Sequence, residues 1–184
     1  MRLEEARWIA TEIALHIPRA DLTRDRTTEP LVLNLGSGTR RAREVSKPHI
    51  DRLTLAPLRE AGYRIVHSDL LEDEGVDLSG DLFDGAFQQQ LADLKPRIVM
   101  FCNVLEHLPV GLRQDVPKII DRLVPAGGYL VMTAPRSYPY HADPIDTLYR
   151  PSPEELAQLF PSMKLAGRAV VGCGSYREEF LNSS

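Results

Sequence analysis

With 184 residues the chain has the length of a single domain that is large enough to bury a hydrophobic core. Hydrophobic residues make up 43% and charged residues 26%, a globular composition that excludes a disordered or fibrous chain. The net charge of −4 argues against a surface built to bind nucleic-acid phosphates, and no apolar stretch approaches the length of a membrane span.

The N-terminal part of the chain predicts one helix and the first strand of a sheet. Apolar residues recur at helical spacing over residues 3–17 and a proline follows, which predicts an amphipathic helix that ends there. Residues 19–30 are polar and charged and indicate a linker. Residues 31–35 form an apolar run that breaks into Gly36-Ser37-Gly38, which predicts a buried parallel strand followed by a tight turn.

Strands and helices then alternate along the chain. We expect strands at 63–68, 76–80, 97–102, 129–133 and 164–171, and helices at 50–61, 82–94, 109–123 and from 152 onward. The predicted fold class is therefore α/β, a Rossmann-like doubly wound, mostly parallel sheet with helices on both faces. A seventh strand would have to come from residues 176–181. Without it, the sheet is truncated at its last strand, and its edge is open or is covered by a partner or by the N-terminal helix.

Polar residues mark the ends of the predicted strands. Asn34 lies within the first strand, while Asp69, Asp81 and Asn103 follow the next three. The carboxyl ends of parallel strands form the ligand crevice of such sheets, so these side chains are expected to converge there. A single Asp at such a place more often caps a turn or helix. Four polar residues in register with a glycine turn favour a ligand site.

Cysteine usage and the first residues of the chain bear on its compartment. Cys102 and Cys173 lie far apart, with neither the spacing of a zinc site nor a disulfide framework, so no residue is assigned to a metal. The opening MRLEEARW carries acids where a signal peptide needs basic and apolar residues. We therefore expect a cytoplasmic protein without nucleic-acid or membrane partners, and we leave open whether it is a monomer or a homodimer.

The ordered combination of these pieces resembles the class I S-adenosylmethionine-dependent methyltransferases, especially the type 11-like group. The matching segments are VLNLGSGT, VHSDL, DLSGDLFD, FCNVLEHL and LVPAGGYLVMTAP, which together cover roughly residues 31–135. The resemblance implies a single methyltransferase-like domain over 1–184. Its cofactor-binding core would span 31–135, preceded by an N-terminal helix at 1–18 and followed by a substrate-side loop and C-terminal elements at 136–184.

The resemblance also implies a role for each matching residue. The residues implied to bind S-adenosylmethionine are Asn34, Gly36, Ser37, Gly38, Asp69, Leu70, Asp81, Leu82, Asn103, Val104 and His107. Gly36 and Gly38 would let the backbone approach the methionine moiety, and Asp69 would hold the ribose hydroxyls. Asp81 and Leu82 would hold the adenine.

On the sulfonium side, the resemblance implies that Asn103 and Val104 line the pocket. Glu106 and His107 would shape its floor, with a charged start of a helix as the alternative interpretation of this pair.

Two departures from the family pattern lie near the glycine turn. Asn34 replaces the usual aspartate and can still orient backbone amides. The third glycine is absent, so we expect a helix to start later and a loop at 40–49 to close over the cofactor. Arg40, Arg41 and Arg43 cluster there, and a solvated face is favoured over an anion-binding patch.

The loop after the fifth strand supplies the acceptor-side candidates. They are Tyr138, Tyr140, His141, Asp143, Asp146, Tyr149 and Arg150. His141 is the first candidate for a general base, because a histidine titrates near operating pH, and His107 is the second. A hydrogen bond within the loop is the slightly favoured alternative role for His141. The tyrosines would form an acceptor wall or pack the loop, with even odds.

Three functions are weighed on this basis. The leading hypothesis is a methyltransferase that acts on a small-molecule or sugar-like acceptor. A nicotinamide-dependent oxidoreductase fits poorly, because the third glycine is absent and Asp69 comes too late for the dinucleotide fingerprint. The alternative is a catalytically weak or inactive module of the same fold that binds the cofactor or a partner, which Asn34 and the missing glycine favour.

Overall fold

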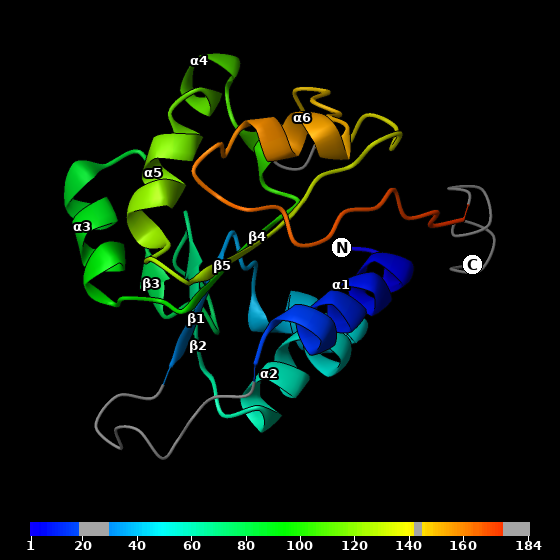
Figure 1. Ribbon diagram of the computed structural model, residues 1–184, viewed down its shortest axis with the longest axis horizontal. Helices are drawn as coiled ribbons and strands as arrows, with labels where there is room; N and C mark the ends of the chain where they lie inside the picture. Colours follow the sequence, from blue (N-terminus) through cyan, green and yellow to red (C-terminus); the bar gives the residue numbers. More distant parts are fainter. Residues whose placement is uncertain (19–29, 142–144, 175–184) are drawn as a thin grey trace.

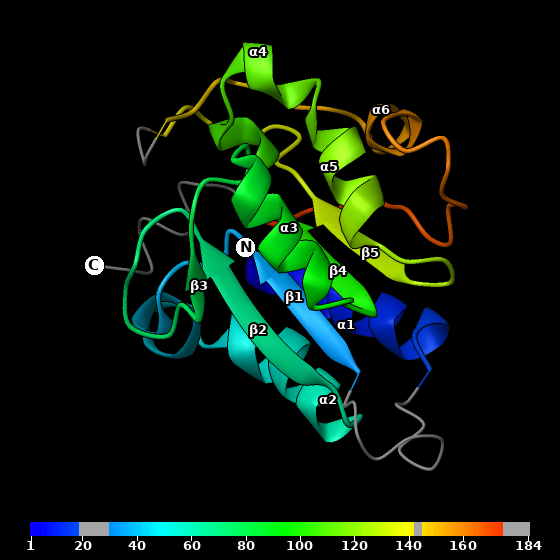
Figure 2. The ribbon, with the colours of Figure 1, turned by 90° about the vertical axis from the view of Figure 1, so that its left-hand side faces the viewer.

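The computed structural model describes residues 1–18, 30–141 and 145–174. Its centre is a five-stranded, all-parallel sheet in the order β3-β2-β1-β4-β5 (Figure 2). The strands are β1 (Leu31–Leu35), β2 (Arg64–Asp69), β3 (Leu78–Ser79), β4 (Ile98–Cys102) and β5 (Tyr129–Thr133). The strand order reverses between β1 and β4, which is where ligand crevices form in sheets of this kind. The predicted α/β, Rossmann-like class is confirmed for the parallel sheet.

Helices flank both faces of this sheet (Figures 1 and 2). The principal α-helices are α1 (Leu3–His16), α2 (Ala56–Glu60), α3 (Gly85–Asp93), α5 (Val116–Leu123) and α6 (Pro153–Gln158). Shorter turns are η1 (Ala42–Ser46) and η2 (Asp51–Leu55), which are π-helical, the 3₁₀ turn η3 (Leu105–His107), and α4 (Val110–Arg113). In the part of the chain that the structure describes, no helix has the length and apolar character needed to cross a membrane.

Side chains of the central strand alternate between two hydrophobic clusters. Leu31, Leu33 and Leu35 pack with residues of α3 and α5, while Val32 packs with residues of α1, η2 and α2. All five residues of β1 are buried, as expected for a strand covered by helices on both faces. The carboxyl ends of β1 and its neighbours β2 and β4 are therefore fixed by a core on both sides.

Proline and a side-chain cap shift two predicted helices. The helix expected at 109–123 is interrupted, because Pro117 lies in the first turn of α5 and cannot continue the helix begun by α4. The helix expected from 82 begins at Gly85, since Asp84 is its N-cap and accepts the backbone N–H of Phe87 at 2.8 Å.

The loop expected at 40–49 is wrong, because the chain is helical from Arg40 and continues into η1. Thr39 Oγ1 accepts the backbone N–H of Ala42 at 3.1 Å and so caps this helix directly after the glycine turn. The missing third glycine does not delay the helix.

The strand expected at 164–171 is also wrong. These residues carry no strand pairing, and residues 164–170 are all exposed, so the alternating pattern has no core face to bury. Gly167 lies so close to α1 that a Cβ there would overlap the Glu12 carboxylate. The segment therefore runs beside α1 instead of joining the sheet. The short strand considered at 176–181 lies outside the described residues.

Candidate functional site

An extended cavity runs along the β5 side of the sheet, from the turn before β5 to the carboxyl ends of the strands, and it includes the point where the strand order reverses. Its volume is about 2490 Å³, above the roughly 300–1,000 Å³ of a typical small-molecule pocket. All residues predicted from the sequence to bind the cofactor line it, and so does His141; the predicted ones are Asn34, Gly36, Ser37, Gly38, Asp69, Leu70, Asp81, Leu82, Asn103, Val104 and His107. The structure thus brings the strand-end residues together, and their individual contacts show what each one does.

The glycine turn after β1 requires glycine for two reasons. Gly36 and Gly38 have φ of +65° and +63°, a left-handed conformation that side chains rarely adopt. A Cβ on Gly36 would also overlap the Val104 side chain. The turn therefore packs its backbone against the residue that follows β4, which joins two parts of the predicted site.

Asp69, the last residue of β2, holds the glycine turn. Its Oδ2 accepts the backbone N–H of Gly38 at 2.7 Å, and its Oδ1 accepts that of Leu70 at 2.8 Å. The backbone N–H of Ser37 donates to the Ser68 carbonyl at 3.1 Å, which ties the turn to β2 a second time. The carboxylate is therefore at the predicted place, and its contacts in this structure are to backbone.

Arg43 holds the other side of the same turn. Its guanidinium, on η1, donates to the carbonyl oxygens of Ser37, Gly38 and Gly75, with the Gly75 bond at 2.7 Å. The residue is 3% exposed, so the prediction of a solvated face is wrong for Arg43, although Arg40 and Arg41 are exposed. The missed signal is helical periodicity, because Arg43 turns inward once a helix starts at Arg40.

Among the described residues, the Asn34 side chain contacts His67 and not the backbone amides that the sequence suggested. It is paired in register with His67 on β2, and its Nδ2 lies 3.2 Å from His67 Nδ1. Burial and then the nearby Arg43 lower the pKa of His67 to about 4. Asn34 therefore belongs to a polar cross-strand pair that favours a neutral imidazole.

Asp81 sits in the turn before α3. Its Oδ1 accepts the backbone N–H of Phe83 at 2.9 Å, which is the turn-capping role weighed as the alternative for any single Asp. Leu70 and Leu82 line the same cavity, and Leu70 is 64% exposed. This side of the cavity is thus apolar with a carboxylate beside it.

The N-terminal end of α1 closes over the ends of β4 and β5. Asn103 has a left-handed φ of +54° and donates from Nδ2 to Glu5 Oε1 at 2.7 Å. Thr133 Oγ1 also donates to Glu5 Oε1, at 2.6 Å. Sequence reasoning missed Glu5, because nothing in the helical pattern marks which acid of α1 reaches the sheet edge.

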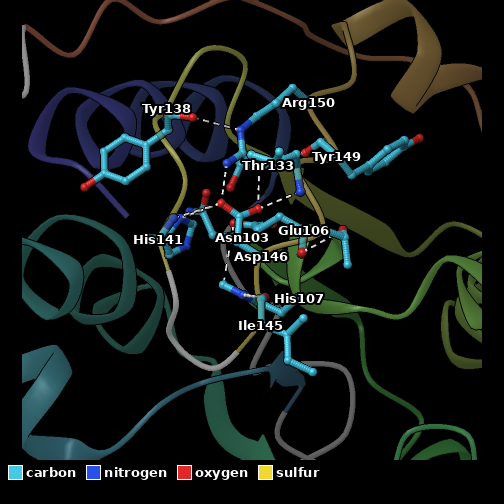
Figure 3. Close-up of polar contacts among 12 residues, drawn as sticks. Asn103, Glu106, His107, Thr133, Tyr138, His141, Ile145, Asp146, Tyr149 and Arg150 are labelled. Atoms are coloured by element: carbon cyan, nitrogen blue, oxygen red, sulfur yellow. Dashed lines mark hydrogen bonds and ion pairs between the residues drawn. The ribbon is translucent and has the colours of Figure 1, made fainter.

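Asp146 organises the loop after β5. Its side chain is fully buried and meets the Arg150 guanidinium at 3.0 Å and 2.6 Å, which holds the pKa of Asp146 well below its usual range (Figure 3). It also accepts the backbone N–H groups of His141 and Leu148. Asp146 and Arg150, both acceptor-side candidates, are therefore structural in this arrangement. The candidate Asp143 lies outside the described residues.

The two candidate bases lie side by side. The His107 and His141 rings are edge to face, with centroids 5.2 Å apart (Figure 3). His107 Nδ1 lies 2.7 Å from the Ile145 carbonyl oxygen, and His141 Nδ1 lies 3.0 Å from Asp146 Oδ2. Among the described residues His141 Nδ1 makes no hydrogen bond, so the loop hydrogen bond weighed for His141 is made by its backbone N–H to Asp146 and not by its ring.

Glu106 completes this group from η3. It lies in the first turn of η3, as the alternative of a charged helix start predicts, but it is 2% exposed, and burial raises the pKa of its carboxyl. Its Oε1 lies 3.8 Å from His107 Nε2, while its Oε2 has no hydrogen-bond partner among the described residues.

The three tyrosines of the loop differ in their surroundings. The Tyr138 ring is edge to face with His141, with centroids 5.4 Å apart, and it lines the cavity. The Arg113 guanidinium stacks 4.0 Å from the Tyr149 ring centroid, so Tyr149 packs the loop. Tyr140 is 64% exposed. One tyrosine therefore suits an acceptor wall, and one packs the loop.

No model of a known protein family, no curated protein and no solved structure matches the chain. A functional assignment therefore depends on the residues of the site itself.

Removing the Arg43 guanidinium is expected to destabilise the glycine turn. Arg43→Gln leaves buried carbonyl oxygens without their donor, so the free energy of unfolding should fall by about 1–3 kcal/mol. Urea unfolding followed by circular dichroism measures this change. Arg41→Gln, at an exposed position of the same helix, is the matched control and should change stability by less than about 0.5 kcal/mol. An equal loss of stability in both variants would contradict the role of Arg43 in holding the glycine turn.

His67 should make the fold less stable in mild acid. The unfolded chain binds a proton near its ordinary pKa of about 6.5, whereas folded His67 does so only near 4. Its contribution to stability is therefore complete above about pH 6.5 and is lost as the pH falls toward 4. In His67→Gln, the free energy of unfolding should fall less steeply across this range. Parallel pH profiles of the two proteins would refute the assignment.

Proposed function

We propose that the protein is an S-adenosylmethionine-dependent methyltransferase that acts on a small-molecule or sugar-like acceptor. One observation carries the proposal: the glycine turn after β1, Asp69 after β2 and Val104 after β4 meet at the reversal of strand order. Ligands bind at this place in open parallel sheets. The order of these residues along the chain also matches the family pattern that the sequence resembles.

The residues present fit the chemical parts of the cofactor. The backbone at Gly38 is open toward the cavity, since a Cβ there would meet only Ala42, at 3.8 Å. Asp69 offers a carboxylate for the ribose hydroxyls, and Leu70 and Leu82 offer apolar surface for the adenine. When bound, the cofactor supplies a methyl group already activated on a sulfonium.

The chain's own task is then to position the acceptor and to take its proton. His107 and His141 stand together at the cavity, and an imidazole nitrogen is a suitable acceptor for the proton of an acceptor hydroxyl. The buried Asp146 carboxylate beside His141 would stabilise the ring once it carries the proton. Tyr138, beside His141, provides an aromatic ring at the acceptor side, with the Arg2 guanidinium 5.9 Å from the ring centroid.

A second function is a module of the same fold that binds the cofactor or a partner without turnover. The contact that favours it is Glu5, which occupies both the Asn103 amide and the Thr133 hydroxyl. Asn34, bonded to His67, also leaves the first motif without its usual acid. The Glu5 contact with Asn103 lies on the side of the cavity where the resemblance places the sulfonium.

Calorimetry with S-adenosylhomocysteine tests the cofactor assignment. We expect binding in the micromolar range, and Asp69→Ala should weaken it at least about tenfold, because a charged hydrogen-bond acceptor is lost. Asp73→Ala is the matched control, since Asp73 is exposed and caps the neighbouring loop by accepting the Glu74 N–H at 2.6 Å. Heat with NAD and none with S-adenosylhomocysteine would overturn the proposal.

Turnover separates the two functions. Incubation of a metabolite library with methyl-labelled S-adenosylmethionine should give a labelled product with the enzyme. Tight binding of the cofactor without a labelled product would favour the binding module.

A further inference from the structure

A buried carboxylate and two imidazoles meet where the cavity borders the loop after β5. Glu106, His107 and His141 each offer one ligand atom, and these atoms all lie within 4.8 Å of one another. We propose that these three residues bind a divalent transition-metal ion. The sequence did not reveal this site, because the pair at 106–107 and the histidine at 141 are far apart in the chain.

Glu106 provides the strongest reason for a cation. The residue is 2% exposed, and its Oε2 has no hydrogen-bond partner among the described residues. A buried carboxylate without a hydrogen-bond donor or a positive charge is costly, and buried polar atoms are nearly always paired. A metal ion between Glu106 and the two imidazoles would give Oε2 a partner.

The His107 ring is held as metal-binding histidines usually are, and the His141 ring has a carboxylate oxygen 3.0 Å from Nδ1, although without a hydrogen bond among the described residues. His107 directs Nδ1 at the Ile145 carbonyl oxygen at 2.7 Å, which leaves Nε2 facing Glu106 (Figure 3). His141 lies beside the buried Asp146 carboxylate, which Arg150 fixes in place. A carbonyl or carboxylate at one ring nitrogen orients the ring and raises the basicity of the other nitrogen.

The donor set selects the kind of metal. Two imidazoles and one carboxylate suit Zn²⁺, Co²⁺, Mn²⁺ or Fe²⁺, whereas Mg²⁺ and Ca²⁺ prefer oxygen ligands alone. Atoms bound to one tetrahedral ion lie about 3.4 Å apart, so the groups would close by at most about 1.4 Å from their present spacing. The side chains of His107 and His141 are 21% and 31% exposed, which leaves access from the cavity.

The metal site would indicate which kind of acceptor the protein methylates, and this step rests on the proposed methyltransferase function. Three protein ligands leave a coordination position open, as in catalytic zinc sites. An acceptor hydroxyl bound there would lose its proton more readily, because a metal ion lowers the pKa of bound oxygen, and the proton would pass to water in the cavity. The acceptor would then bind through oxygen, and the two histidines would serve as ligands instead of proton acceptors.

Metal titration of the chelator-treated full chain tests the proposal without any cofactor. Calorimetry with Zn²⁺ and absorption with Co²⁺ should both show one equivalent bound, with the ligand-field bands of a low-coordinate Co²⁺ site. Glu106→Gln and His141→Asn should each weaken binding at least about tenfold. His16→Asn, in the partly exposed His16–Glu12 pair of α1, is the matched control and should bind as the unaltered chain does.

Thermal melts followed by circular dichroism establish that each variant is folded. If Glu106→Gln does not fold, His141→Asn, at a partly exposed side chain, still tests the metal site. Equal affinity in all variants, or no saturable binding in the unaltered chain, would overturn the metal site. Because no S-adenosylhomocysteine is present, either result leaves the cofactor test independent.

Discussion

The candidate site depends on a glycine turn that is clamped from two sides. The Asp69 carboxylate accepts a hydrogen bond from the Gly38 N–H, and the buried Arg43 guanidinium donates to the carbonyl oxygens of Ser37 and Gly38. Hydrogen bonds that involve a charged group are stronger than neutral ones. Here the charged groups of Asp69 and Arg43 bond backbone N–H and C=O groups of the turn that would otherwise be unpaired. The turn is thereby fixed where the sheet order reverses, and the cavity forms around it.

A second anchor sets the opposite wall of the cavity. The buried Asp146–Arg150 pair folds the loop after β5, and Thr147 bonds the Glu106 carbonyl oxygen through its N–H at 2.8 Å and its hydroxyl at 2.9 Å. These contacts bring His141 against His107, although 34 positions separate them in the sequence. The chemistry of this wall is therefore a property of the loop's packing, and the proton-transfer and metal-binding roles are two alternative uses of the same residues.

Local sequence signals predicted the sheet well, because apolar runs and turn residues act over a few neighbours. The strands at 31–35 and 129–133 have the predicted bounds, and the strand-end residues do line one cavity. The predictions that were wrong depend on residues far away in the sequence. Arg43 is buried against the glycine turn, and residues 164–170 are exposed and run beside α1 instead of forming a strand. Glu106 could not be singled out from the sequence for the same reason, because only its burial, with Oε2 unpaired among the described residues, distinguishes it from an ordinary acid at a helix start.

The central claim is that the crevice at the carboxyl edge of the sheet binds the cofactor. Amide NMR of the ¹⁵N-labelled protein during titration with S-adenosylhomocysteine tests it most directly, because it locates the ligand residue by residue. The account predicts the largest shifts at Gly38, Leu70 and Leu82, where the glycine turn and the ends of β2 and β3 line the cavity. Shifts confined to other surfaces, or a spectrum that does not change, would contradict it.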